Sequence, residues 1–390
     1  MTSISTMEPL IPEDRKHVLE ELATELVDRA SRLAGRVHPV MQESLGDLVR
    51  AMNCYYSNLI EGHDTHPVDI DRALAGEYAA DSTKRNLQLE ARAHIEVQQM
   101  IDRGEGPTPV VSTEFLLWVH REFCTRLPED LLWVTHPTTG ERLPVIPGEL
   151  RQHHVVVGRH LAPEPAELAA FLERFVAAYS GAGMGRLRRI IAVAAAHHRL
   201  LWIHPFLDGN GRVARLFSYA LLRELNVGSS LWSVARGLAR QQRDYKSALQ
   251  AADEPRRGDL DGRGNLTLGG LETFSAFFLR TCIDQVTFMD SLFEPHELLN
   301  RMEVWVTEEI RAKRLPKGAW PLLREAVLAG EYPRGRVTEL TGYEERQART
   351  VLSKLVGEGL LVSATERGPV RLGFPIGIVE RWFPRLYPGL

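Results

Sequence analysis

The chain has 390 residues, 44% of them hydrophobic and 25% charged, with a formal net charge of −4. This composition is typical of an ordinary soluble globular protein of two or three domains. The charge is too small to favour or exclude a nucleic-acid partner. No apolar run reaches the ~18 residues that would span a bilayer.

Cysteine usage and the N-terminal residues bear on the cellular compartment. Cys54, Cys124 and Cys282 are far apart and lack metal-ligand spacing, which favours free thiols in a reducing compartment. Residues 1–12 contain no basic region followed by an apolar core, so no signal peptide is predicted. We therefore expect a cytoplasmic protein without a membrane segment.

The first third of the chain has the apolar spacing of helices, which are predicted over 13–36, 41–59 and, in several segments, 67–135. The second helix ends in the hexapeptide SNLIEG, in which Ser57 and Glu61 share a helix face. An acidic side chain at a helix C-terminus opposes the helix dipole, so we expect a partner for Glu61. A solvated carboxylate is the alternative.

A short β-hairpin is predicted over residues 144–158, because a Pro-Gly turn precedes the strand-forming Val155, Val156 and Val157. Helices are then predicted over 164–179 and 186–203.

The dodecapeptide HPFLDGNGRVAR, residues 204–215, has the residue types of a phosphate-binding site. Arg212 and Arg215 share a face of the helix predicted to begin near Arg212, and their guanidinium forks suit phosphate oxygens. Three residues before them tolerate positive φ and can form an anion-binding nest of backbone N–H groups: Gly209, Asn210 and Gly211.

Two further residues of the dodecapeptide suit phosphate chemistry. Asp208 can hold Mg²⁺, which takes one or two carboxylates together with phosphate oxygens. His204 can accept a proton from a hydroxyl group near neutral pH. The alternatives are a helix–loop–helix joint with solvated arginines, or a zinc site formed with His197 and His198. The histidine spacing lacks the i, i+4 pair of zinc helices, and His197 is expected to be structural.

The dodecapeptide resembles the signature of the Fic family, HPFx[D/E]GNGRxxR, at every specified position. That family is known for transferring AMP from ATP to a protein hydroxyl. The resemblance implies a mainly α fold with a small β-hairpin flap, and ATP and Mg²⁺ as ligands. It assigns His204 as catalytic base, Asp208 as metal ligand, and as the nucleotide site Gly209, Asn210, Gly211, Arg212 and Arg215.

The hexapeptide SNLIEG resembles the Fic inhibitory motif, [S/T]xxxE[G/N], through Ser57 and Glu61. In the family this glutamate pairs with the second signature arginine, which is Arg215 here. An arginine held by a carboxylate is not free to bind the γ-phosphate, so the resemblance implies an autoinhibited protein with an N-terminal inhibitory helix.

The resemblance extends to two other places. Residues 147–158 resemble the Fic flap, whose Val155, Val156 and Val157 would pair with an extended segment of a target protein. Tyr245 matches a position where an aromatic side chain flanks the nucleotide base, with packing on a neighbouring helix as the alternative.

The last part of the chain is expected to form a separate module. A helix over 233–251, a polar loop over 253–270 and a helix over 271–289 precede it. Residues 315–390 resemble a winged helix-turn-helix with a two-stranded wing. Its third helix, 344–358, has balanced charge, which favours a packing or protein-contact role over DNA binding.

These observations predict a protein adenylyltransferase that modifies Ser, Thr or Tyr of a target protein or of itself, as a homodimer. The alternatives are an enzyme that removes AMP, or a DNA-binding regulator in which the Fic domain is a scaffold. The predicted domains are an N-terminal helix (1–40), an inhibitory region (41–66), a Fic catalytic domain (67–292), a connecting helix (293–314) and the winged module (315–390).

Overall fold

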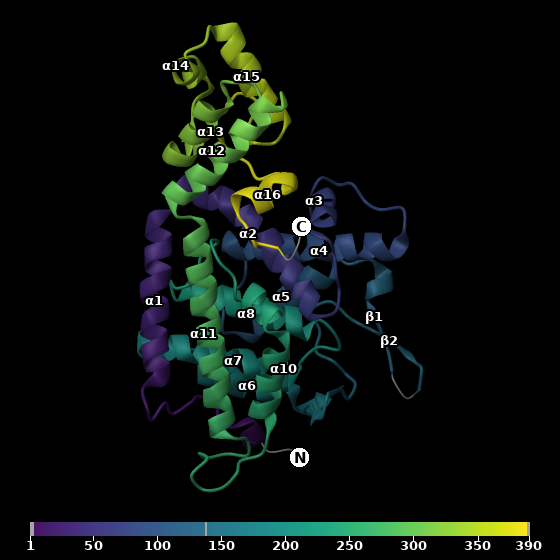
Figure 1. The fold of residues 1–390 in the computed structure, drawn as a ribbon. Helices are drawn as coiled ribbons and strands as arrows, with labels where there is room; N and C mark the ends of the chain where they lie inside the picture. The colour runs from purple at the N-terminus through teal and green to yellow at the C-terminus, as the bar shows by residue number, and fades with distance from the viewer. Residues whose placement is uncertain (1–3, 137–138, 388–390) are drawn as a thin grey trace. The chain divides into compact units, whose positions relative to one another are not determined.

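Helices dominate the computed structural model, which describes residues 4–136 and 139–387 (Figure 1). The predicted mainly α fold with small antiparallel β elements is confirmed. The chain divides into a first unit, residues 1–30 and 53–286, and a second unit, residues 31–52 and 287–390. No helix in the described part of the chain is long and apolar enough to cross a membrane.

Three helices contribute residues to both units: α1 (Val18–Arg36), α2 (Pro39–Ile60) and α11 (Leu268–Leu292). The first unit also contains α3 (Pro67–Leu74), α4 (Ser82–Asp102), α5 (Thr113–Cys124), α6 (Leu168–Tyr179), α7 (Arg186–Ile203), α8 (Asn210–Glu224), α9 (Val234–Arg240) and α10 (Gln242–Asp253). Its strands form two antiparallel hairpins, β1 (Trp133–Thr135) with β2 (Arg142–Pro144) and β3 (Val156–Val157) with β4 (His160–Leu161).

The centre of the first unit is the helix pair α7 and α8. Every residue from Ile190 to Leu200 of α7 is buried, and the part from Ile190 to Ala196 is apolar throughout. It packs against α6 and α8, and α8 in turn packs against α4 and α5 (Figure 1). The loop between α7 and α8 therefore joins two helices that are packed against α4, α5 and α6.

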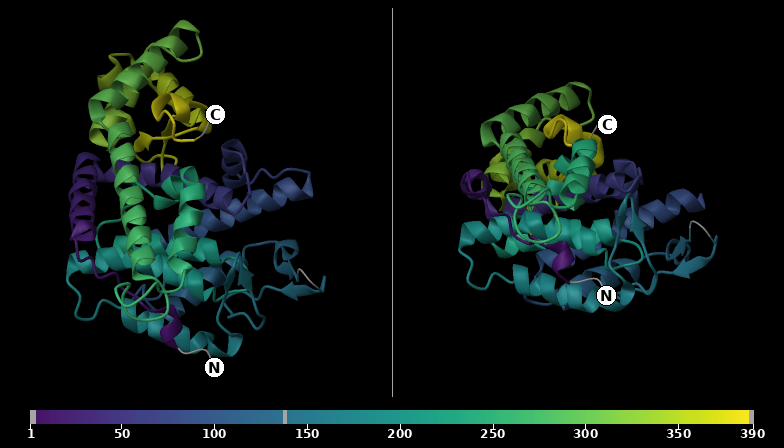
Figure 2. Two further views of the ribbon diagram at one scale, coloured as in Figure 1. Left: turned by 60° about the horizontal axis from the view of Figure 1, so that its bottom comes forward. Right: turned by 90° about the horizontal axis from the view of Figure 1, so that it is seen from below.

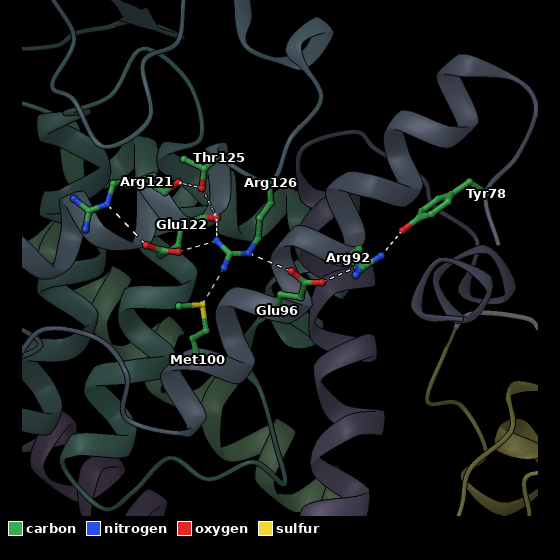
Figure 3. Close-up of polar contacts among 8 residues, drawn as sticks. All are labelled: Tyr78, Arg92, Glu96, Met100, Arg121, Glu122, Thr125 and Arg126. Atoms are coloured by element: carbon green, nitrogen blue, oxygen red, sulfur yellow. Dashed lines mark hydrogen bonds and ion pairs between the residues drawn. The ribbon is translucent and has the colours of Figure 1, made fainter. Parts of the chain in front are cut away.

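Helices α4 and α5 are joined on their outer side by charged residues (Figure 3). The Arg126 guanidinium donates to Glu96 of α4 at 3.2 Å and to Glu122 of α5 at 2.7 Å. Glu96 also accepts from Arg92 at 2.7 Å. Such partly exposed pairs contribute little to stability, but they keep charge on the outer face of α4 and leave its inner face for α8.

The N-terminal segment, residues 4–12, is fixed to α6 and α7 (Figure 2). The hydroxyl of Tyr179 donates to the carbonyl of Leu10 at 2.6 Å, and Arg199 donates to the carbonyl of Pro9 at 2.9 Å. These backbone carbonyls satisfy the buried hydroxyl of Tyr179 and part of the buried guanidinium of Arg199.

The second unit contains α12 (Pro295–Arg311), α13 (Ala319–Ala329), α14 (Val337–Thr341), α15 (Glu345–Gly357) and α16 (Ile376–Trp382). Its antiparallel sheet has the strand order β5 (Glu331–Tyr332), β7 (Val370–Leu372), β6 (Leu361–Val362). Three helices followed by a hairpin is the order expected from the sequence. The strand β5 was not expected, and it makes the sheet three-stranded.

Two predictions of local structure are wrong. Residues 133–135 are a strand instead of a helix end, because Trp, Val and Thr favour strands and pair here with Arg142–Pro144. The single helix predicted over 233–251 is two helices, α9 and α10. Gln241 separates them because it leaves the helical conformation, with φ −114° and ψ 36°. The predicted domain boundaries differ from those of the two units and stay predictions.

Candidate active site

The loop between α7 and α8 is shaped by two residues with positive φ. His204 ends α7 in the left-handed conformation, with φ 49° and ψ 62°, and the following Pro205 cannot continue the helix. Gly209, with φ 80°, precedes the first residue of α8, Asn210. The loop therefore connects the C-terminus of one buried helix to the N-terminus of the next.

The predicted nest of backbone N–H groups is not formed. Of Gly209, Asn210 and Gly211, only Gly209 has positive φ, and α8 begins at Asn210 instead of near Arg212. The free N–H groups therefore belong to the first turn of a 15-residue helix, whose dipole also favours an anion. A phosphate site at this place stays a prediction, with the N-terminus of α8 in place of the predicted nest.

Asn210 was expected to bind phosphate, yet its side chain closes the loop. Its Oδ1 accepts the backbone N–H of Phe206 at 2.9 Å, and its Nδ2 donates to the Phe206 carbonyl at 2.8 Å. The Phe206 ring is stacked on His120 with 4.0 Å between ring centroids. The amide is thus occupied, and only the backbone N–H of Asn210 faces the anion position as part of the first turn.

His204 is neutral near pH 7, because burial lowers its pKa to about 4. Its Nδ1 lies 3.3 Å from the Leu201 carbonyl oxygen, which can only accept a hydrogen bond. The proton therefore resides on Nδ1, and the lone pair of Nε2 is left to accept a proton from another group.

Asp208 has a half-exposed side chain, and its carboxylate lies 3.6 Å from Nη2 of Arg212. One carboxylate beside a phosphate site suits Mg²⁺, which keeps several waters and binds phosphate oxygens. Among residues 4–136 and 139–387, no three His, Cys, Asp or Glu side chains form a metal-binding group. The residues therefore fit an ion held jointly by Asp208 and a nucleotide, and not one enclosed by protein ligands.

Arg215 is bound by the end of α2, as the resemblance implied. Its Nη2 donates to Glu61 Oε1 at 2.6 Å, and its Nε donates to the Ser57 hydroxyl at 2.8 Å. Burial alone would raise the pKa of Glu61, but the charges of Arg215 and Arg212 outweigh it and hold the pKa below its usual range. A Cβ on Gly211 would lie 2.2 Å from Glu61 Oε1. Glu61 therefore occupies the space above the first turn of α8.

Arg212 is bound by a carboxylate that sequence reasoning missed. Glu90 of α4 is 1% exposed, forms an ion pair with Arg212 through Oε1, and lies 2.7 Å from Nδ1 of His63 through Oε2. A signal for it exists in the sequence, because Glu90 shares the apolar stripe of its helix with His94 and Val97. A carboxylate on such a stripe requires a buried partner.

Tyr245 is buried, and its hydroxyl lies 2.7 Å from Nε2 of His197. The other nitrogen of His197 lies 2.8 Å from the hydroxyl of Ser218 on α8. This placement supports the packing alternative for Tyr245 over contact with a nucleotide base. Both nitrogens of His197 are used inside the core, as expected of a structural histidine, and neither is directed to a metal.

The hairpin in the region of the expected flap pairs β3 with β4, and its turn is Gly158-Arg159. It lies later in the chain than the predicted range 144–158, because the valine strand pairs with the residues after it and not with those before it. Val156 and Val157 are exposed and Val155 is half-buried. In the described part of the chain, β3 pairs with β4 only, so its other edge is open to an added strand.

Arg151, whose role the sequence did not indicate, joins the base of the flap to the active loop. Its buried guanidinium donates to the carbonyls of His204 at 2.8 Å, His153 at 2.9 Å and Pro163 at 2.5 Å. A hollow beside this link is lined by His120, Pro144, Val145, Ile146, Glu149, Leu150, Arg151, Gln152, His153 and Leu207. The flap and His204 are therefore fixed relative to each other.

Comparison with known proteins agrees with the resemblance of residues 204–215 to the Fic signature. Residues 110–222 match the model of the Fic/DOC family. The Protein adenylyltransferase Fic of Drosophila melanogaster is 37% identical over 133 residues, which are 34% of this chain and 25% of that protein. The same values hold for the protein of that name from Drosophila erecta. The match thus spans about a quarter of the length of these curated relatives.

Solved structures with a similar fold include Fic proteins. A Fic family protein from Desulfovibrio desulfuricans G20 has a TM-score of 0.53 and 17% sequence identity, and the match covers 94% of this chain and 98% of that one. Fic-1 from C. elegans has a TM-score of 0.51 and 15% identity over 70% of this chain and 72% of the other. From its signature loop, its fold and the family match, the chain carries a domain of the Fic/DOC family.

Proposed function

We propose that the protein is an adenylyltransferase that moves AMP from ATP to a Ser, Thr or Tyr hydroxyl of a target protein or of itself. The observation that carries the proposal is the grouping of a neutral His204, the free N–H groups of the first turn of α8 and two arginines around one loop. The name of the Drosophila relatives, Protein adenylyltransferase Fic, supports the same reaction.

In this proposal the N-terminus of α8 binds the α- and β-phosphates of ATP through its free N–H groups. Arg212 and Arg215 neutralise the outer phosphates. Asp208 would hold Mg²⁺ together with phosphate oxygens, and the ion would supply further charge neutralisation.

His204 then accepts the proton of the target hydroxyl at Nε2 while the hydroxyl oxygen bonds to the α-phosphorus. The bond from the α-phosphorus to its bridging oxygen breaks, and pyrophosphate leaves. The left-handed turn at His204 and the Arg151 hydrogen bond to its carbonyl keep the imidazole in place for this transfer.

We propose that the free edge of β3 aligns the target. An extended segment could pair with Val156 and Val157 and bring its hydroxyl to the active loop, to which Arg151 fixes the flap. Backbone pairing sets the register of the target with little demand on its side chains.

We propose that Glu61 autoinhibits the enzyme. While it occupies Arg215 and the space above Gly211, the outer phosphates of ATP cannot take their place on Arg215. Glu61 must leave before transfer.

The test is incubation of the purified full chain with ATP labelled at the α-phosphate, followed by mass spectrometry of its own hydroxyl residues. His204→Ala should reduce AMP incorporation about 100- to 10,000-fold, the range for loss of a general base. The matched control is His296→Ala, which removes an exposed histidine from the second unit and should leave incorporation unchanged. Equal incorporation by His204→Ala and the unmodified chain would reject the base assignment.

Removal of AMP from a modified protein is a second candidate, because the Glu61 carboxylate is 31% exposed beside the site and could orient a water molecule. The discriminating measurement is the loss of AMP from a chain that already carries it. Release that disappears in Glu61→Gly would favour this reaction over transfer.

Two further predictions concern the assembly and location of the chain. We retain the predictions of a homodimer and of a cytoplasmic location. The second rests on the three cysteines, which are buried free thiols as expected in a reducing compartment. We also retain a protein-contact role for residues 315–390. A mobility-shift assay against duplex DNA at increasing salt tests it, and specific binding would reject it.

A further inference from the structure

Glu90 is the buried charged group at this site for which the proposed mechanism has no use. It lies on α4, is 1% exposed, and uses both carboxylate oxygens, one on Arg212 and one on His63. A carboxylate in the core is tolerated only with such partners, because burial strongly disfavours an unpaired charge. Because Glu90 contacts two residues at the site, we consider what each contact does.

The first contact sets the orientation of Arg212. The guanidinium lies over the Phe123 ring, with 5.0 Å between its Cζ and the ring centroid, and Glu90 holds Nη1. Nη2 is left on the side of Asp208, at 3.6 Å. The fork is thus fixed with one nitrogen in the core and the other directed to the loop where phosphate would bind.

The second contact reaches the inhibitory segment, which we define as residues 57–63. His63 follows Glu61 by two residues, and its backbone N–H donates to the carbonyl of Asn58 at 3.0 Å, which closes the end of α2. Nδ1 of His63 lies 2.7 Å from Glu90. The inhibitory segment is therefore attached to Arg215 through Ser57 and Glu61, to Gln242 through the Ile60 carbonyl, and to Glu90 through His63.

We infer that Glu90 is a positioning residue that orients Arg212 and, through His63, holds the inhibitory segment at a point separate from Arg215. The part that concerns Arg212 rests on the proposed adenylyl transfer. The part that concerns the segment does not, and the two experiments below separate them.

The first experiment measures transfer in the Glu61→Gly background, where inhibition is removed. Glu90→Gln should lower kcat about 10- to 100-fold, because a misplaced Arg212 no longer meets the phosphates, while the Kd for ATP changes by less than about threefold. Glu96→Gln is the matched control: it lies on the same helix, pairs with Arg92 and Arg126, and should leave kcat unchanged.

A purely structural role predicts a lower melting temperature with an unchanged kcat for the folded protein, and that result would overturn the assignment. Glu90→Asp serves if the glutamine variant does not fold. It keeps the charge, but it is one methylene too short to contact Arg212 and His63 together, so the same fall in kcat is expected.

The second experiment follows backbone hydrogen exchange in the chain that retains Glu61. His63→Asn and Glu90→Gln should each speed exchange in residues 57–63 on the order of 10-fold, while Glu96→Gln leaves it unchanged. Unchanged exchange in both variants would reject the attachment of the segment to Glu90 through His63. If Glu61→Gly transfers no AMP, the proposed function fails, and the exchange comparison still decides whether Glu90 holds the segment.

Discussion

Arg212 and Arg215 lie three residues apart on α8, and each is paired with a carboxylate from an earlier helix, yet the two pairs lie in different surroundings. Glu61 is 31% exposed and sits over the first turn of α8, where an anion would bind. Glu90 is 1% exposed and lies in the core. On our proposal, a phosphate arriving from solvent replaces the first carboxylate and leaves the second in place. The same residue pair can therefore act as a switch or as a fixed support, depending on its access to water.

The largest effect that separates the two pairs is expected from alanine at each arginine, in the Glu61→Gly background. Both variants should lose transfer about 100-fold or more, as for loss of a preorganised phosphate ligand. Only Arg212→Ala should also destabilise the fold, by about 3–5 kcal/mol, because it leaves the buried Glu90 carboxylate without the arginine that balances its charge. Transfer assays and urea unfolding of both variants check this.

Equal stability of the two alanine variants would contradict the distinction between a buried and an open carboxylate. Arg126→Ala is the control for loss of an arginine from the outer face of the first unit. It should change unfolding by less than about 1 kcal/mol, since its pairs are partly exposed.

Gly211→Ala tests whether Glu61 occupies the space above the first turn of α8. The new Cβ would lie 2.2 Å from Glu61 Oε1, so the carboxylate must shift. We expect a destabilisation of about 1–3 kcal/mol, as for other overpacked sites. Most of this penalty should vanish in the Glu61→Gly background, where the collision is absent. Unfolding of the four chains in a double-mutant cycle measures the coupling.

Gly35→Ala is the matched control for that cycle, because no atom lies within 4 Å of its new Cβ. It should change stability equally with and without Glu61. A penalty for Gly211→Ala that is the same in both backgrounds would show that Glu61 does not occupy the space above α8.

The last stability effect concerns pH. Burial, assisted by the charge of Arg215, lowers the pKa of His94 and of His197 to about 3. The unfolded chain binds protons at these histidines below pH ~6.5 while the folded chain does not, so stability is lost as pH falls from ~6.5 towards 3. Each should contribute about 2 kcal/mol of loss between pH 7 and pH 5. His94→Gln should reduce the loss by that amount in urea unfolding, and an unchanged loss would contradict the assignment.

The sequence predicts the residues of the site that lie in linear motifs. The contact of Glu61 with Arg215 followed from the resemblance and is present at 2.6 Å. The helical character of the chain followed from apolar spacing. Glu90 and Arg151 were not predicted, because their roles depend on how α4 and the flap pack against α8 and its loop. The side-chain role of Asn210 was also missed, since a loop-closing amide and a phosphate ligand look alike in sequence.

The central claim is that Glu61, bound to Arg215, restrains AMP transfer. The most direct test is the initial rate of labelled AMP incorporation by Glu61→Gly relative to the unmodified chain, at equal protein and ATP concentrations. Releasing Arg215 from a charged hydrogen bond of about 1.5–3 kcal/mol corresponds to roughly a 10- to 100-fold higher rate. A rate equal to or below that of the unmodified chain would contradict the claim that Glu61 on Arg215 restrains the reaction.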